Sequence, residues 1–451
     1  MSKRMQHQRL IIGIHRGVAG AALSLAIVLV AAVVATGSAQ AQSYTPYVYS
    51  FPGTPGGAYP AGAGLVLDTS SGYLYGTTYY GGTQLCNGSG GCGTVFKIDT
   101  NLNPASVLYS FPMYAGDGEY PYAGVVLDGS GNLYGTTVQG GTYGAGTVFK
   151  LGTSEQVLHS FPRTAGDGAY PYAGVVLDGS GNLYGTTELA GDLACNGGNG
   201  CGTVFKVDTS NHETVLHRFT GTWGDGRTLY SEGVVLDGKG NLYGATSGGG
   251  DYTNCQSFGC GTVFKINTTY TGTTLMALNE TVLYRFTGTG GDGLEPVASL
   301  VQDANGNLYG TTTWGGLYDH GTVFMVNPTT HTEAVLYSFQ GGADGRWPQS
   351  SLVWDGNGNL YGTTYLGGNL ACHPGYGCGT VFELSPEVQG SCPSGSNPGN
   401  GWCETALYSF NGTPDGAFPV SSLVLDGNGN LYGTTSGGGT YGNGTVFKLT
   451  P

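Results

Sequence analysis

The feature that most constrains this 451-residue chain is a tripeptide, Leu-Tyr-Gly, which recurs seven times in a constant setting. Its tyrosines are Tyr75, Tyr134, Tyr184, Tyr243, Tyr309, Tyr361 and Tyr432. The unit at residues 107–151 shows the full order: VLYSF, a GDG loop, a proline, GVVLD, GSGN, LYGTT, a glycine-rich loop and GTVFK. Repeats of about 50–70 residues indicate copies of one structural unit packed side by side, not two or three unrelated domains.

Each repeat contains four short runs rich in Val, Leu, Tyr, Phe and Thr, bounded by Gly, Asn, Asp or Pro, which is the pattern of strands and turns. No helical period accompanies them. The sequence therefore predicts an all-β fold, a seven-bladed β-propeller with four antiparallel strands per blade. From the axis outward, the expected strands are GVVLD, NLYGTT, GTVFK and VLYSF. The glycine of LYG is costly within a strand, and its recurrence predicts a close approach of backbones where the blades converge.

The two ends of the repeat region predict how the ring closes. Residues 47–51 form a VLYSF-type strand that follows no complete repeat, whereas the last repeat stops after its GTVFK strand at residues 444–448. We expect the N-terminal strand to complete the seventh blade, so that the ring has no open edge.

The repeated unit VLYSF…GDG…GVVLDG, GNLYGTT…GTVFK resembles the GloVer tandem repeat of the choice-of-anchor bacterial surface proteins. The resemblance covers residues 47–451 in seven co-linear copies. It implies an exported or surface-displayed protein of unassigned biochemical activity.

Residues 1–41 have the pattern of a signal peptide, and residues 42–451 are expected to form a single propeller domain. The basic residues of the first segment are Lys3, Arg4, Arg9 and Arg16, followed by an apolar stretch and the small-residue site AQA at 39–41. An uncleaved anchor is the alternative. The mature protein is expected to be secreted, periplasmic or on the cell surface, and monomeric, with no stable membrane insertion. Because cleavage removes four basic residues, its formal charge changes from −14 to −18, which excludes nucleic acid as a partner.

The ten cysteines fall into five neighbouring pairs in glycine-rich loops, which favours local disulfides over zinc sites in an exported chain. The pairs are Cys86 with Cys92, Cys195 with Cys201, Cys255 with Cys260, Cys372 with Cys378, and Cys392 with Cys403. Because each disulfide closes only a small loop, we expect them to fix loops rather than to hold the fold. The sequence predicts no metal ligand and no cofactor.

Two repeated features are candidate ligand-binding residues on the face that carries the GDG loops. The first is a ring of aspartates: Asp117, Asp167, Asp225, Asp292, Asp344 and Asp415. They could attract calcium or cationic groups, but a residue that recurs in every blade also fits a turn that stabilises the blade. The second is an aromatic residue before the proline that leads into GVVLD: Tyr59, Tyr120, Tyr170, Trp347 and Phe418. These rings could stack on sugars or pack between loops.

No residue is predicted to be catalytic. The aspartates that end GVVLD (Asp68, Asp128, Asp178, Asp237, Asp303, Asp355 and Asp426) are interpreted as turn residues. Unrepeated polar residues on the loop face are better candidates for catalysis than the scattered histidines, since an enzyme on a symmetric scaffold must break its symmetry, but they also fit solvated loops. They are Arg227, Asp251, Glu295, Asp319, His320 and Arg346.

These patterns favour a binding or scaffold module outside the cytoplasm, with a glycan or a surface protein as its partner. One alternative is a polysaccharide-acting enzyme, a lyase or hydrolase, with carboxylates at the channel mouth. The other is a structural module without a ligand. Unique charged residues that converge in one pocket would favour the enzyme, and aromatic rings around the mouth would favour glycan binding.

Overall fold

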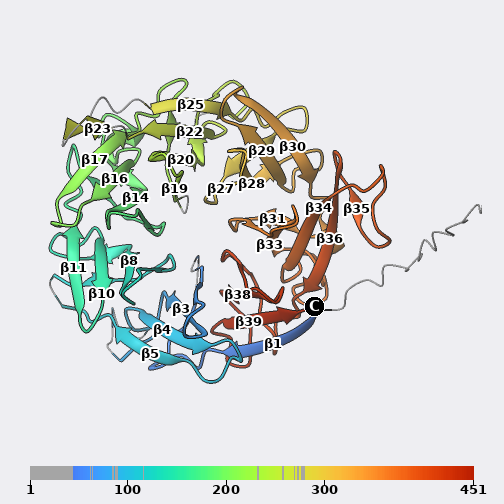
Figure 1. Cartoon of the computed structure of the whole chain (residues 1–451), viewed down its shortest axis with the longest axis horizontal. Coiled ribbons are helices and arrows are strands. Elements are labelled where there is room, and N and C mark those ends of the chain that lie inside the picture. The colour runs from blue at the N-terminus through green and yellow to red at the C-terminus, as the bar shows by residue number, and fades with distance from the viewer. Residues whose placement is uncertain are drawn as a thin grey trace, which may run out of the picture. The chain divides into compact units, whose positions relative to one another are not determined.

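The computed structural model describes residues 44–451 except 61, 63, 84–85, 87–89, 115, 231–232, 256–257, 269, 272–273 and 276–279. The predicted signal peptide therefore lies outside the described residues. Seven antiparallel sheets, each built on the same four strands, follow one another around a central axis (Figure 1), which confirms the predicted propeller. The described part contains two short 3-10 helices, Asn196–Gly198 and Gly342–Asp344. No helix in that part is long and apolar enough to cross a membrane.

The strands of each blade run outward from the axis in the predicted order. The first four blades are β2 (Val66–Asp68), β3 (Tyr73–Thr78), β4 (Thr94–Asp99) and β5 (Ser106–Ser110); β7 (Val126–Leu127), β8 (Leu133–Thr137), β10 (Thr147–Leu151) and β11 (Glu155–Ser160); β13 (Val176–Leu177), β14 (Leu183–Thr187), β16 (Thr203–Val207) and β17 (Glu213–Arg218); and β19 (Val235–Leu236), β20 (Asn241–Thr246), β22 (Thr262–Asn267) and β25 (Glu280–Arg285).

The other three blades repeat this arrangement. They are β27 (Val301–Gln302), β28 (Leu308–Gly315), β29 (Thr322–Asn327) and β30 (Thr332–Ser338); β32 (Val353–Trp354), β33 (Leu360–Leu366), β34 (Thr380–Pro386) and β36 (Trp402–Ser409); and β37 (Val424–Leu425), β38 (Leu431–Thr435), β39 (Thr445–Thr450) and β1 (Thr45–Ser50).

The first strand closes the ring, as predicted. β1 pairs antiparallel with β39, with Tyr47 opposite Lys448 and Ser50 opposite Thr445. The amide of Phe51 extends this pairing by donating to the carbonyl of Gly444. Figure 1 shows β1, in blue, along the outer edge of β39, in red. The outer edge of β39 is therefore paired and not open.

Adjacent blades are held together by a phenylalanine pair that recurs seven times. The phenylalanine after each outer strand meets the phenylalanine of the GTVFK strand in the next blade, edge to face, as Phe51 meets Phe96 at 5.1 Å between centroids. The same pair joins the remaining blades: Phe111/Phe149, Phe161/Phe205, Phe219/Phe264, Phe286/Phe324, Phe339/Phe382 and Phe410/Phe447. All of these rings are completely buried. Large buried aromatic pairs of this geometry stabilise a core beyond their area alone.

The reason for the LYG glycine differs from the prediction. A Cβ at Gly76 would lie 2.8 Å from a Leu65 methyl and 2.9 Å from the ring of Phe96, its cross-strand partner, so side chains and not backbone fill that space. The prediction of a close backbone approach was therefore wrong. The glycine makes room for the phenylalanine that joins the blades.

The predicted cysteine pairing is confirmed in full. Disulfides join Cys86 to Cys92, Cys195 to Cys201, Cys255 to Cys260, Cys372 to Cys378, and Cys392 to Cys403. No free cysteine lies in the described part of the chain. Five disulfides are typical of proteins that fold outside the cytoplasm.

Four of the five disulfides also reach into the core. Their second cysteines, Cys92, Cys201, Cys260 and Cys378, are buried, and each belongs to a cluster of hydrophobic side chains. Their carbonyls accept an amide hydrogen bond from the segment that leads into the next blade, at 2.8, 3.0, 3.1 and 2.9 Å. Ala145, His320 and Asn443 accept the same bond in the other blades, so this bond does not depend on a disulfide. Each of the four cysteines directly precedes the glycine of GTVF, so the strand that follows draws it into the core.

The aspartates that end GVVLD shape the hairpin that follows, as predicted. Asp128 accepts from the amides of Ser130 and Asn132, each at 2.8 Å. Asp178, Asp237, Asp303, Asp355 and Asp426 repeat this arrangement. These carboxylates are thus used within the turn, on the side of the propeller away from the GDG loops.

Candidate functional site at the channel mouth

The GDG loops and the glycine-rich loops lie on one face of the propeller, where they pair with each other. β6 (Gly118–Glu119), from the GDG loop, forms a small antiparallel sheet with β9 (Gln139–Gly140), from the glycine-rich loop. β12 (Gly168–Ala169) with β15 (Leu189–Ala190) and β18 (Gly226–Arg227) with β21 (Gly248–Gly249) do the same. These paired loops surround the segments that lead into the innermost strands.

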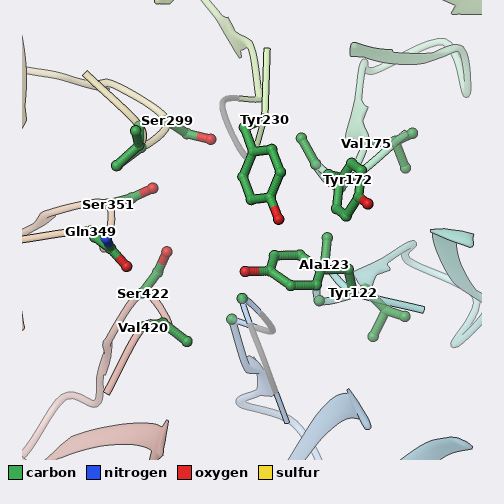
Figure 2. Close-up of a pocket in the computed structure, with 18 of the residues that line it drawn as sticks. Tyr122, Ala123, Tyr172, Val175, Tyr230, Ser299, Gln349, Ser351, Val420 and Ser422 are labelled. Carbon is green, nitrogen blue, oxygen red and sulfur yellow. The ribbon is translucent and has the colours of Figure 1, made fainter. Parts of the chain in front are cut away.

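A cavity of about 300 Å³ opens on the axis among those segments. Its lining comes from all seven blades and is divided into two unlike sides (Figure 2). Blades two to four contribute three tyrosines: Tyr122, Tyr172 and Tyr230. Blades five to seven contribute small polar and aliphatic residues: Val297, Ser299, Gln349, Ser351, Val420 and Ser422. No described residue that lines this cavity carries a formal charge.

The three tyrosines form one contiguous aromatic surface. Tyr172 and Tyr230 are stacked, with centroids 4.7 Å apart and planes 18° from parallel. Tyr122 meets Tyr172 edge-on at 5.4 Å. In Figure 2 the hydroxyl groups of Tyr122 and Tyr230 point toward the middle of the cavity. Burial raises the pKa of Tyr122 and of Tyr172, with a further contribution from the nearby Tyr230 in each case. These hydroxyls therefore remain protonated and can donate hydrogen bonds.

The opposite side supplies small hydrogen-bonding groups. Figure 2 shows Ser299, Ser351, Ser422 and Gln349 facing the tyrosines across the cavity. A serine hydroxyl can donate and accept, and the glutamine amide can do both at separate atoms. The cavity thus combines an apolar aromatic wall with a wall of polar groups.

Hydrogen bonds between blades hold the tyrosine-bearing segments in place. The hydroxyl of Thr77, in β3, donates to the carbonyl of Ala123 at 2.8 Å, and the hydroxyl of Thr136, in β8, donates in the same way to Ala173. Both threonines belong to LYGTT and are buried. The repeated part of each blade therefore positions the variable tyrosine of the next one.

The predicted aromatic ring has a different place in the structure. Tyr59, Tyr120, Tyr170, Trp347 and Phe418 adopt a left-handed backbone, with φ between 55° and 61°, and none of them lines the channel cavity. Thr228 and Glu295 occupy the same position in the other two blades and share this conformation. The amide of each residue donates to the carbonyl just before the GTVFK strand of the previous blade, as Tyr120 does to Cys92 at 2.8 Å. The position thus joins adjacent blades through its backbone.

Some of these rings nevertheless connect with the channel. Tyr59 and Tyr120 line a surface pocket together with Tyr80. Tyr79 contacts Tyr120 at 5.1 Å on one side and Tyr122 at 6.0 Å on the other. A continuous path of aromatic rings therefore leads from that pocket into the cavity. Tyr170, Trp347 and Phe418 instead contact Arg163, Trp314 and Tyr365, respectively.

The six aspartates of the GDG loops use their carboxylates within their own repeats. Asp117 accepts from the Tyr109 hydroxyl at 2.5 Å and from the amide of Gly118 at 2.6 Å. Asp292, Asp344 and Asp415 accept in the same way from the tyrosine of their outer strand. Asp167 and Asp225 face a histidine at that place. These contacts support the interpretation of the aspartates as residues that stabilise the loop.

A second pocket, of about 390 Å³, adjoins the channel cavity and shares Tyr230 and Val297 with it. Its charged lining residues are Glu188, Arg227 and Glu295. Burial raises the pKa of Glu188 and that of Glu295. Two of the unrepeated polar residues, Arg227 and Glu295, are thus brought together, and sequence analysis missed Glu188.

The other unrepeated residues have local roles. Asp319 accepts from the amide of Gly315 at 3.0 Å, and Asp251 accepts from that of Thr253. Arg346 donates to the carbonyls of Gly375 and Tyr376. The neighbours Asp319 and His320 therefore show no shared acid–base arrangement.

A family comparison agrees with this architecture. The model of the Gloeobacter/Verrucomicrobia repeat matches residues 37–192, 82–281 and 254–451, which together extend over all seven blades. The chain belongs to this repeat family. The GloVer resemblance predicted from the sequence is thereby confirmed.

Other comparisons of this GloVer chain are weak. No curated protein matches it in sequence. Similar solved structures include a luciferin-regenerating enzyme (14% identity, TM-score 0.41, covering 91% of this chain and 96% of that one) and the Pseudomonas aeruginosa periplasmic gluconolactonase PpgL (14%, 0.43, 78% and 87%). A puromycin hydrolase is similar at 14% identity and a TM-score of 0.48, covering 87% of this chain and 53% of that one. Likenesses at this level carry no argument about activity.

The channel tyrosines of this GloVer protein carried a signal that sequence analysis did not use. Tyr122 and Tyr172 directly follow the proline that comes after Tyr120 and Tyr170, respectively. Tyr230 follows Leu229 at the same place. This position starts the segment nearest the axis. It is tyrosine in blades two to four, and Val297, Gln349 and Val420 in blades five to seven. A position that differs between repeats was a better guide to the cavity than one that recurs.

Proposed function

We propose that this protein binds a neutral saccharide at the mouth of its central channel. The observation that carries the proposal is the division of the cavity, with Tyr122, Tyr172 and Tyr230 on one side and Ser299, Ser351, Ser422 and Gln349 on the other. A pyranose has an apolar face of C–H groups and a rim of hydroxyls. Aromatic rings pack on the first, and hydroxyl and amide groups pair with the second.

Size and charge support this ligand class. A volume of about 300 Å³ lies at the lower end of the range typical of small-molecule sites. The uncharged lining offers no counter-ion to a uronate or sulfated sugar, and the acidic protein repels anions. The aromatic path through Tyr79 to Tyr120 offers room for further sugar units beyond the cavity.

The test is a glycan array with the mature protein, followed by titration of the best ligand against variants. Tyr230→Ala removes one stacked ring and should weaken binding about 5- to 150-fold, the equivalent of roughly 1–3 kcal/mol. Tyr143→Ala is the matched control, because that tyrosine is 63% exposed and lines neither the cavity nor the adjoining pocket. Equal affinity for the wild-type protein and Tyr230→Ala would contradict the proposal, as would an array without neutral ligands.

The adjoining pocket favours one alternative, hydrolysis of the bound glycan. Glycoside hydrolysis uses a protonated carboxyl group as acid and a carboxylate as its partner. Glu188 and Glu295 line one pocket beside the cavity, and burial raises the pKa of each, so that one could serve as the acid while the other is the carboxylate. The activity would be supported if the wild-type protein releases reducing ends from an oligosaccharide that it binds on the array. Both Glu188→Gln and Glu295→Gln should abolish this release. Binding without any release would leave a binding module.

A further inference from the structure

Two clusters at the outer edge of the propeller repeat the same three residue types. In the first, His159 of β11, Asp167 of the following GDG loop and Glu213 of β17 bring ligand atoms within 4.8 Å of one another. In the second, His217 of β17, Asp225 and Glu280 of β25 do the same. Each cluster joins two blades, because its histidine lies in one outer strand, its aspartate follows that strand, and its glutamate starts the outer strand of the next blade.

In each cluster the histidine nitrogen and one glutamate oxygen are buried without a hydrogen-bond partner, whereas the aspartate also accepts from its own loop. Nε2 of His159 and Oε1 of Glu213 have none, and neither do Nε2 of His217 and Oε1 of Glu280. The histidine nitrogen lies 3.5 Å from a carboxylate oxygen of Asp167 in one cluster and 3.6 Å from one of Asp225 in the other. Such separations are long for a hydrogen bond but match two ligands on one tetrahedral ion, which lie about 3.3–3.6 Å apart for bonds of 2.0–2.2 Å.

The other blades show what the histidines replace. At the equivalent place Tyr109, Tyr284, Tyr337 and Tyr408 donate their hydroxyls to the GDG aspartate. A tyrosine satisfies the aspartate directly, whereas a neutral imidazole that carries its proton on Nδ1 presents a nitrogen lone pair to the same carboxylate. In both clusters an arginine from the next outer strand fixes the aspartate loop: Arg218 donates to the carbonyl of Gly166 and Arg285 to that of Gly224. Each carbonyl belongs to the residue before the aspartate.

We propose that each His–Asp–Glu cluster binds one divalent transition-metal ion, of which zinc is the representative, as a clamp between adjacent blades. One imidazole nitrogen and two carboxylate oxygens form a ligand set that zinc accepts, and water would complete the coordination. The two sites would join blade two to blade three and blade three to blade four. These are the blades that carry Tyr122, Tyr172 and Tyr230.

The chain itself provides the variant for the test. His159→Tyr combined with His217→Tyr restores the tyrosine found in the five other blades, so this double variant should fold. After treatment with a chelator and dialysis against zinc, the wild-type protein should retain two more zinc ions per chain than the double variant, measured by plasma mass spectrometry. Zinc should raise the melting temperature of the wild-type protein and leave that of the double variant unchanged, since only a ligand of the folded state stabilises it.

Two further variants complete the experiment. His331→Asn alters a histidine outside the clusters and should keep the wild-type zinc content and thermal shift. Glu213→Gln combined with Glu280→Gln keeps both histidines but removes a carboxylate oxygen from each site, and should lose the zinc-dependent shift. Equal zinc content in the wild-type protein and the histidine double variant would overturn the proposal. So would a wild-type protein whose melting temperature does not respond to zinc.

Discussion

Tyr172 and Tyr230 stack face to face across the junction of the third and fourth blades, 4.7 Å apart between ring centroids. The stack exposes the edge of both rings and the hydroxyl of Tyr230 to the same cavity (Figure 2). Because the partners come from different blades, the aromatic wall exists only when the ring is correctly assembled. Ligand binding at this wall and the integrity of the blade junction are therefore linked.

The stack allows the apolar and polar contributions to saccharide binding to be separated. Tyr230→Phe keeps the ring but removes a hydroxyl that points into the cavity, and should weaken binding at most about tenfold, the cost of one lost hydrogen bond. Tyr230→Ala removes the ring as well and should weaken it about 5- to 150-fold. Calorimetric titration of both variants measures the difference. Equal effects of the two substitutions would show that the hydroxyl, and not the stacked ring, carries the affinity.

The repeated aspartates are expected to affect stability rather than binding. Asp117→Ala removes the acceptor of the Tyr109 hydroxyl and of the Gly118 amide and should lower the free energy of unfolding by about 1–3 kcal/mol. Denaturant titration measures this loss, and Asp251→Ala, at an exposed turn, is the control. Loss of saccharide binding with unchanged stability would instead identify the aspartate ring as the ligand site.

Much of the fold could be predicted from the sequence because each blade repeats the same local signals. The strand runs, the turn aspartates and the cysteine neighbours act within a few residues, and the unpaired strand at residues 47–51 left one way to close the ring. The LYG glycine was misinterpreted because its neighbour, the ring of Phe96, lies on another strand. Burial of the second cysteine in four of the disulfides was missed for a similar reason, since it depends on the packing of two blades. A sequence shows that space is needed but not which atoms fill it.

The candidate site was harder to predict because it depends on differences between repeats. Tyr122, Tyr172 and Tyr230 face one cavity only because the ring brings three separate repeats to the axis. The aromatic position that Tyr59 and Tyr120 occupy recurs in five blades, but its left-handed backbone donates a hydrogen bond to the previous blade and does not bring the ring into the cavity. Glu188 follows LYGTT in one repeat alone, and its place beside Arg227 and Glu295 results from the pairing of loops in space.

Removal of the closing strand should destabilise the whole ring. Deletion of residues 42–52 takes away β1 and Phe51, whose ring is completely buried against Phe96. We expect a loss on the order of 5 kcal/mol or more, together with self-association through the exposed edge of β39. Thermal melting and size-exclusion chromatography measure the two effects. Deletion of residues 42–43 alone, which leaves β1 and the core contacts of Tyr44 intact, should change neither, and an unchanged melting temperature in the longer deletion would refute the closing role.

The last prediction concerns pH and a buried carboxyl group between blades five and six. Glu404 pairs with Leu384 across β36 and β34, is completely buried, and accepts from the side-chain amide of Asn397 at 2.7 Å. Burial, reinforced by the nearby Asp344, raises the pKa of Glu404 to about 8, against an ordinary value near 4.5. The folded state therefore holds a proton that the unfolded state releases between these values. The stabilisation is fully present below pH 4.5 and is lost as the pH rises toward 8.

Between pH 5 and 8 this single group should make the free energy of unfolding fall by up to about 1.4 kcal/mol per pH unit. Glu404→Gln keeps the size of the side chain and stays uncharged, so its unfolding free energy should depend less on pH, and it should be the more stable protein at pH 8. Glu387→Gln, at a partly exposed position in the same blade, is the control. Denaturant titrations at about pH 5, 6.5 and 8 provide the comparison. Parallel pH profiles for the wild-type protein and Glu404→Gln would show that Glu404 is already ionised in the folded ring.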